Sequence, residues 1–154
     1  MKYKVYKKVA KNWFTDKPIY TYSLVSKDGI TLSELKVEEE KAWEKRMYKL
    51  DKYMDKKILY LYNFETNSYY RNKGYGTYLL KNVIRRFKAK YDFIHLNACP
   101  YCFKNGIVKY EPPRNGLDKQ KLFEFYESFG FELHGMAEEE YGIFMLKIRE
   151  RYTC

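Results

Sequence analysis

The pattern of apolar and polar residues predicts β-strands near both ends of the chain, and over Tyr3–Val9 the two kinds alternate with a period of two. In the first part of the chain the pattern covers Tyr3–Val9 and Pro18–Ser26, and a turn at residues 28–29 ends the second stretch. Later, residues 131–137 and 143–148 flank a polar turn, and together they predict a closing hairpin.

A helical period of apolar residues follows the first two predicted strands. The apolar positions recur at spacings of four, three and four: Trp43, Met47, Leu50 and Met54. Ser33 is a candidate N-cap, and glutamates 38–40 suit the early turns of a helix. The sequence therefore predicts one long helix from Ser33 to about Lys56, with its apolar stripe packed on a sheet.

The rest of the chain alternates apolar stretches with amphipathic ones. Lys57–Thr66 is almost wholly apolar, which is typical of a central strand buried on both faces. The other predicted elements are, in order, a glycine-bearing loop with a helix to about Lys90, a strand over Asp92–Ala98, an irregular segment over Cys99–Gly116, and a helix that Asp118 caps and Gly130 ends. This order predicts an α/β sandwich around a mixed sheet.

The composition is that of one folded domain with a basic surface. The 154 residues suffice for one well-cored domain, and no linker, repeat or low-complexity tract divides them. Lysine and arginine number 30 against 20 acids, which leaves a formal net charge of +10. The cations are interleaved with acids, so the charge favours anionic partners in general, and nucleic acid is not an expected partner.

The sequence shows no targeting or membrane-spanning pattern. Met1–Phe14 is charged but lacks the apolar core of a signal peptide, and no stretch approaches the roughly 18 apolar residues of a membrane span. Three cysteines, an odd number, favour a reducing compartment over a disulfide framework. We therefore expect a cytoplasmic protein with no membrane partner, and its oligomeric state is left open.

A glycine-bearing loop opens the helix that follows the central strand. Residues 71–76, Arg-Asn-Lys-Gly-Tyr-Gly, fit the pattern Arg/Gln-x-x-Gly-x-Gly/Ala. The loop is not a Walker loop, because no Gly-Lys-Ser/Thr follows four spacer residues. It is not a dinucleotide fingerprint either, because Tyr78 and Leu79 stand where the third glycine of that fingerprint falls. Its glycines let backbone N–H groups approach oxygen anions, and the helix N-terminus adds partial positive charge, so the loop suits a phosphate ligand.

A second segment gives this loop a family context. Residues 125–131, Phe-Tyr-Glu-Ser-Phe-Gly-Phe, match a "(L/F)YExxGF" pattern at the end of the next predicted helix but one. With a strand between them and a hairpin after them, the two segments resemble the GNAT superfamily of N-acetyltransferases over roughly residues 57–148. The resemblance implies an α/β (α+β) fold with a mixed, mostly antiparallel central sheet flanked by helices, in a single compact domain over residues 1–154.

The resemblance also implies a site for acetyl-CoA. Backbone around Phe64 and Thr66 would bind the pantetheine arm in the manner of an added strand. Tyr126 would lie near the sulfur and protonate the departing thiolate, because an ordinary tyrosine pKa of about 10 keeps its hydroxyl protonated at neutral pH. The pyrophosphate would be held by backbone N–H groups of Arg71, Asn72, Lys73, Gly74, Tyr75, Gly76 and Thr77.

The implied activity is direct transfer of an acetyl group from acetyl-CoA to an amine of a protein, a polyamine or a small molecule, without a metal. Glu65 is the acidic candidate for the base, although strand alternation leaves its side open. Glutamates 138–140 would either attract a cationic amine or form a solvated tip, and His95 fits a core histidine better than a base. The alternative function is a coenzyme A-binding module that acts through a partner without turnover.

Two features depart from the GNAT pattern. Lys119 stands where many members have an asparagine that contacts pantetheine, and one long predicted helix replaces the usual pair of early helices. Since early helices often line the acceptor pocket in that family, the acceptor cannot be inferred by analogy.

The segment Cys99–Cys102, Cys-Pro-Tyr-Cys, has the spacing of a redox motif or of half a zinc site. Asn105 and Gly106 break the helix that a reactive thiol needs, and no second pair of this kind completes a zinc site. The sequence therefore favours two ordinary loop thiols.

Overall fold

A computed structural model describes residues 2–100, 102–104, 106–109, 112, 116–137 and 141–149. The chain divides into two compact units, residues 1–94 with 147–154 and residues 95–146. The first unit carries the glycine loop, and the second carries Tyr126. This division does not test the prediction of one domain over residues 1–154, which stays a prediction.

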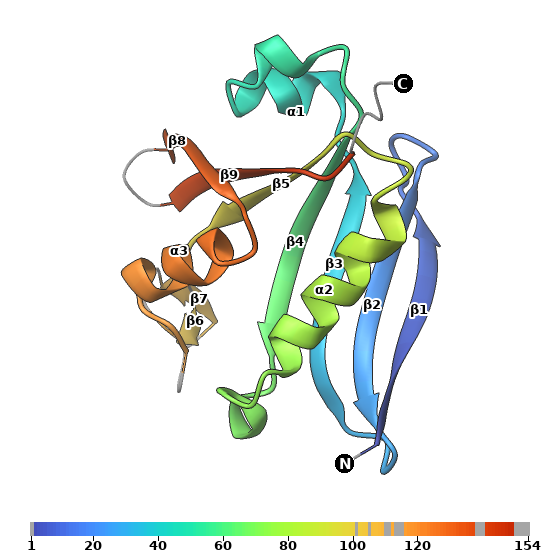
Figure 1. The fold of residues 1–154 in the computed structure, drawn as a ribbon, viewed down its shortest axis with the longest axis vertical. Coiled ribbons are helices and arrows are strands. Elements are labelled where there is room, and N and C mark those ends of the chain that lie inside the picture. Colours follow the sequence, from blue (N-terminus) through green and yellow to red (C-terminus); the bar gives the residue numbers. More distant parts are fainter. Residues whose placement is uncertain are drawn as a thin grey trace, which may run out of the picture. The chain divides into compact units, whose positions relative to one another are not determined.

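The first unit is a sheet of long antiparallel strands with a helix along one face (Figure 1). Its strands pair in the order β1 (Tyr3–Lys11), β2 (Pro18–Ser26), β3 (Thr31–Glu39) and β4 (Ile58–Thr66). Its helices are α1 (Ala42–Met47) and α2 (Tyr75–Phe87), with the short 3-10 helices η1 (Asp51–Tyr53) and η2 (Ser68–Tyr70). The predicted first two strands, the strand over residues 57–66 and the helix after the glycine loop are confirmed.

Helix α2 covers the core of the first unit. Its apolar stripe, Leu79, Leu80, Val83 and Phe87, is buried and packs on β2 and β3. On the sheet, Leu35 and Val37 are fully buried beneath it. Burial of each such side chain stabilises the fold by about 1.5–3 kcal/mol, so this helix is fixed by packing along its whole length.

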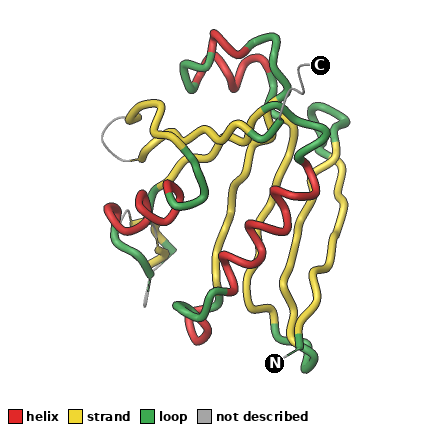
Figure 2. The backbone as a smooth tube through the Cα atoms, viewed as in Figure 1, coloured by secondary structure: helices red, strands yellow, loops and turns green. Residues whose placement is uncertain are grey.

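The second unit contains a hairpin, a helix and a pair of very short strands (Figure 2). The strands β5 (Phe93–Ala98) and β9 (Tyr141–Lys147) lie mostly in this unit. The elements that lie wholly in it are β6 (Cys102–Lys104), β7 (Ile107–Lys109), α3 (Lys119–Glu127) and β8 (Glu132–Ala137). The strands β8 and β9 pair antiparallel, as predicted for the closing hairpin. The predicted cap is also present, because the Asp118 carboxylate accepts a 2.9 Å hydrogen bond from the Lys121 N–H.

The predicted long helix from Ser33 to Lys56 is wrong. Residues 31–39 form β3, which pairs with β2 on one side and β4 on the other, and only Ala42–Met47 is α-helical. Of the predicted apolar stripe, Leu50 is fully buried, whereas Trp43 and Met47 are 58% and 56% exposed. The helix propensity of the glutamates is overridden by strand pairing over a long sequence distance, which a local pattern cannot show.

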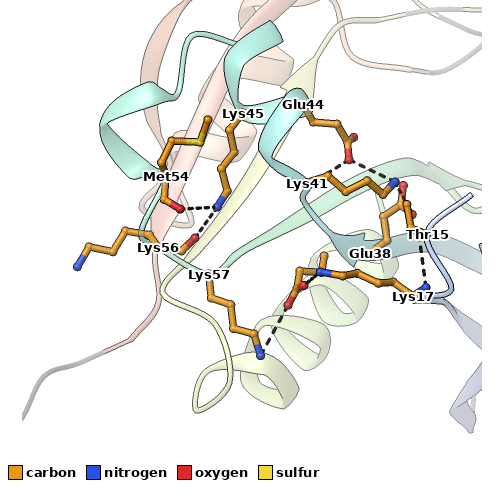
Figure 3. A network of polar contacts seen from close by, with 10 residues as sticks. Thr15, Lys17, Glu38, Lys41, Glu44, Lys45, Met54, Lys56 and Lys57 are labelled. Carbon is orange, nitrogen blue, oxygen red and sulfur yellow. Dashed lines mark hydrogen bonds and ion pairs between the residues drawn. The ribbon is translucent and has the colours of Figure 1, made fainter.

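A buried lysine ties α1 to the chain that follows it (Figure 3). The Lys45 ammonium donates hydrogen bonds to the carbonyls of Lys56 at 2.7 Å and Met54 at 3.3 Å. At the start of the same helix, the Glu44 carboxylate accepts a hydrogen bond from the Lys41 N–H at 3.2 Å. No helix in the described part of the chain has the length and the hydropathy that crossing a bilayer requires.

We expect Lys45→Met to lower the free energy of unfolding by about 1–3 kcal/mol, because the carbonyls of Met54 and Lys56 lose the charged donor of a buried side chain. Urea unfolding measures this loss. Lys81→Met, at an exposed position of α2, is the matched control and should change stability by less than about 0.5 kcal/mol. Equal losses in the two variants would contradict a structural role for the Lys45 ammonium.

Candidate functional site

The glycine loop has a backbone shape that directs N–H groups outward. Asn72 and Gly74 have φ angles of 64° and 84°, in the left-handed region that Asn and Gly adopt most readily. Gly74 is the N-cap of α2, and no side chain caps the helix there. The first N–H groups of α2 lack partners within the helix, so they remain available to an anion.

Gly76 lies against the end of β4, where no larger residue fits. A Cβ atom at this position would be 2.9 Å from Thr66 Oγ1 and 3.5 Å from the Phe64 ring. Thr66 Oγ1 is itself 3.1 Å from Ser33 Oγ, and Ser33 Oγ also donates to the Glu65 carbonyl at 3.0 Å. The second glycine of the motif therefore permits a close approach of helix to strand, and Ser33 braces the strand end instead of capping a helix.

The charged side chains of the loop are anchored to the fold. The Arg71 Nε donates a 2.9 Å hydrogen bond to the Thr66 carbonyl, so this side chain joins the loop to the last residue of β4. The Lys73 ammonium lies 5.7 Å from the centre of the Tyr70 ring. Both cations stay next to the N-terminus of α2 and add to its positive potential.

Tyrosines from three elements surround the beginning of α2. The Tyr3 ring packs edge-on against Tyr75 and Tyr78, with centroid distances of 5.7 Å and 5.0 Å. Tyr70 lies 6.4 Å from Tyr75 on the loop side. The first strand of the chain thus fixes the turn that carries the predicted phosphate-binding amides.

Glu65, the candidate base, points away from this loop. Phe64 and Thr66 face Gly76, and Glu65, between them on β4, lies on the opposite face of the strand. There it is exposed and stands directly opposite Glu34 of β3. Its role as a base is not tested by this placement and stays a prediction.

That opposite face of β4 has an acidic and aromatic neighbourhood that the sequence did not predict. Burial raises the pKa of Tyr62 to about 12, with further contributions from Glu38 and Glu44. The Tyr62 ring stacks on Tyr60 at 5.4 Å. The cluster was missed because Tyr62 lies on β4, and the pairing of β4 with β3 brings it near Glu38 and Glu44. Both glutamates also form ion pairs with Lys41 (Figure 3).

Tyr126 lies in the second unit, on α3, and is buried. Its ring contacts Phe125, Phe131 and Phe144 at centroid distances of 5.2, 5.8 and 6.2 Å. These contacts fix the ring plane. His95 on β5 is fully buried and its Nε2 lies 2.8 Å from Asn97 Oδ1, which suits a core histidine.

The remaining candidates are the turn glutamates and the cysteine pair. Glutamates 138–140 lie outside the described residues. The Cys99 thiol is half-buried and donates to the Pro100 carbonyl at 3.5 Å, while residues 102–104 form β6, paired with β7, in place of a helix. Within the described ranges, no three His, Cys, Asp or Glu side chains form a group that could hold a metal ion.

Comparison with solved structures identifies the fold. The chain is similar to NAA60 of Arabidopsis thaliana in complex with acetyl-CoA, with 11% identity over 84% of this chain and 76% of that chain and a TM-score of 0.57. It is similar to the N-acetyltransferase YlbP of Bacillus subtilis in complex with coenzyme A, with 14% identity over 95% and 97% of the two chains and a TM-score of 0.56.

A third similar structure is FeeM, an N-acyl amino acid synthase from uncultured soil microbes. Here the identity is 10%, the match covers 96% of this chain and 92% of that chain, and the TM-score is 0.62. By sequence, no family model and no curated protein matches the chain.

The chain therefore has the GNAT fold. The predicted fold class, a mixed and mostly antiparallel sheet flanked by helices, is confirmed.

Proposed function

We propose that this protein is an N-acetyltransferase that moves an acetyl group from acetyl-CoA to an amine acceptor. The observation that carries the proposal is the uncapped N-terminus of α2, reached through two left-handed residues and held against β4 at Gly76. Two proteins of the same fold have acetyl-CoA or coenzyme A bound in their structures, which supports the choice of co-substrate.

The residues of the first unit fit a pyrophosphate. Backbone N–H groups from Arg71 to Thr77 would hold its oxygens, and the cations of Arg71 and Lys73 would offset its charge. Backbone of β4 around Phe64 and Thr66 would bind the pantetheine arm. Acetyl-CoA supplies the acetyl thioester. The protein positions this thioester, and its side chains donate or accept the protons that the reaction transfers.

The reaction needs two proton transfers, and we assign one of them to Tyr126. The Tyr126 hydroxyl would donate its proton to the departing thiolate, and the aromatic contacts around the ring would keep that hydroxyl in one direction. A base would take the proton of the attacking amine, and Glu65 or an ordered water serves there. The acceptor is a protein, a polyamine or a small molecule.

The alternative is a coenzyme A-binding module that acts through a partner without turnover. Such a module would bind the cofactor through the same glycine loop, but it would not transfer the acetyl group to an acceptor. For either function the cytoplasm is the expected compartment, and nucleic acid is not an expected partner.

The direct test is incubation with acetyl-CoA. We expect acetyl-CoA to raise the melting temperature and a panel of amines to release free coenzyme A thiol, measured with a thiol reagent. Stabilisation without thiol release from any amine would favour the binding module. If acetyl-CoA does not stabilise the fold at all, both functions are wrong.

Alanine substitutions at two glycines of similar conformation distinguish a loss of acetyl-CoA binding from a loss of stability through backbone strain. Gly74 and Gly29 have φ angles of 84° and 82°, and a Cβ atom at either would meet no atom within 4 Å. Alanine at each position should therefore cost a similar 1–2 kcal/mol or so of stability. Only Gly74→Ala should weaken acetyl-CoA binding, measured by calorimetry. An equal loss of affinity in Gly29→Ala would contradict the assignment of the glycine loop as the acetyl-CoA site.

A further inference from the structure

Two large aromatic side chains at the turn between β1 and β2 have no cover in the described structure. Trp13 is 96% exposed and Phe14 is 97% exposed. The turn is nevertheless well tied: the Asn12 N–H donates to the Lys17 carbonyl at 2.9 Å, and the Phe14 N–H donates to Asn12 Oδ1 at 2.9 Å. A hydrogen-bonded turn that presents neighbouring Trp and Phe side chains to solvent indicates an interaction site.

A basic pocket lies between β1, β2 and the last turn of α2, with a volume of about 230 Å³. Tyr22 and Phe87, both buried, belong to its lining. The Lys7 ammonium lies 5.9 Å from the centre of the Tyr20 ring, and the Arg86 guanidinium lies 5.4 Å from that of Tyr22. The lining residues are Lys7, Tyr20, Tyr22, Arg86, Phe87 and Lys90.

The charge of this pocket is not compensated within the described residues. None of its lining residues is acidic, and none of Lys7, Arg86 and Lys90 forms an ion pair with a described carboxylate. Three cations around one cavity repel one another, and an anion with several oxygens relieves that repulsion. Guanidinium and ammonium groups together match the oxygens of a phosphate group.

The last turn of α2, which contributes Arg86 and Phe87 to the pocket, lies at the same end of the first unit as the turn between β1 and β2 (Figure 1). Phe87, the last residue of α2, contacts Tyr20 at 5.8 Å, and Tyr20 is only two residues from the pair Lys11 and Pro18 that closes the hairpin. The other end of α2, with the glycine loop, contacts Tyr3 at the far end of β1. The basic pocket is therefore separate from the predicted coenzyme A loop.

We propose that this end of the first unit docks on an anionic phospholipid surface, with a lipid phosphate in the basic pocket and the side chains of Trp13 and Phe14 in the interface. A free phosphate compound leaves the exposed Trp13 and Phe14 side chains unexplained. An apolar partner leaves unexplained the pocket cations that form no ion pair with a described carboxylate. Aromatic side chains favour the headgroup boundary, and cations add attraction to anionic lipid. The formal charge of +10 favours the same surface. The expectation of no membrane partner was based on the lack of a membrane-spanning segment in the sequence. Docking on a membrane surface does not require such a segment.

The two tryptophans of the chain make this docking measurable. In Trp43→Phe, the remaining Trp13 should shift its fluorescence to shorter wavelength with vesicles of phosphatidylcholine and phosphatidylserine, and not with phosphatidylcholine alone. In Trp13→Phe, the remaining Trp43 lies on α1, which Lys41 and Glu38 connect to Asn12 of the same turn, so its shift should be smaller than that of Trp13. Absence of any Trp13 shift, or an equal shift with neutral vesicles, would overturn the proposal.

Co-sedimentation separates the contributions of the turn and the pocket. Trp13→Ser with Phe14→Ser, and Arg86→Gln with Lys90→Gln, should each lower binding to anionic vesicles by about tenfold, and high salt should lower it further. Lys81→Gln with Arg85→Gln, at exposed positions of α2 that do not line the pocket, should lower binding less. Unchanged binding in the turn variant would overturn the proposal. The proposal would also be overturned if the protein bound inorganic phosphate, lost that binding in Arg86→Gln with Lys90→Gln, and did not bind the vesicles. Acetyl-CoA stabilisation should be the same in all these variants, so the outcome is independent of the proposed enzyme activity.

Discussion

Replacing Gly76 by alanine is expected to weaken acetyl-CoA binding by about tenfold or more. The added Cβ would lie 2.9 Å from Thr66 Oγ1, so the first turn of α2 must move away from β4 and take its N–H groups with it. Overpacking of this kind costs about 1–3 kcal/mol, and each 1.4 kcal/mol is a tenfold change in affinity. Calorimetric titration with acetyl-CoA gives the change directly.

Two further variants test the physical reason for that loss. Gly135→Ala, at a site where a Cβ would meet no atom within 4 Å, is the control and should leave binding unchanged. Combining Gly76→Ala with Thr66→Ala removes the clashing oxygen and should restore part of the affinity. If the double variant binds no better than Gly76→Ala, the contact between α2 and β4 does not explain the glycine.

Tyr126→Phe is expected to lower the rate of amine acetylation by about 10²–10⁴-fold, the range associated with loss of a general acid. The affinity for acetyl-CoA should change little, because the ring keeps its contacts with Phe131 and Phe144. Steady-state rates with the best amine of the panel, together with acetyl-CoA titration, separate the two effects.

Tyr91→Phe is the matched control for this substitution. Tyr91 is 9% exposed against 7% for Tyr126, so each change removes one hydroxyl from a mostly buried ring. The control variant should retain its rate. A rate for Tyr126→Phe equal to that of the original protein would exclude the proposed proton donor, and an equal drop in both variants would point to general loss of packing.

Local signals in the sequence predicted those parts of the fold that local chemistry determines. The strand predicted over Pro18–Ser26 is β2 with the same bounds, and Asp118, the predicted cap, caps α3. The glycine loop was recognised because left-handed backbone at Gly74 needs a residue type visible in the sequence.

The errors arose where distant residues decide the outcome. Ser33 is next to Thr66 in space and 33 residues from it in the sequence, so its hydroxyl could not be placed from a helical pattern. The same holds for Gly76, whose necessity comes from a contact with Thr66 of a strand outside its own helix. Trp13 gave no signal, because exposure of an apolar residue is a property of the folded surface.

The pairing of β3 with β4 has one more consequence for the candidate base. Lys36 is opposite Tyr62 and Glu34 is opposite Glu65, so β4 carries one more residue than β3 between these pairs, with Asn63 at a φ of 50°. This bulge reverses the parity of the strand. Before it, the odd-numbered Leu59 and Leu61 are buried in the core; after it, the even-numbered side chains face Gly76. An acid engineered to reach the loop side of β4 therefore belongs at an even position beyond the bulge, whereas counting by twos from the buried Leu59 and Leu61 would place it on the wrong face.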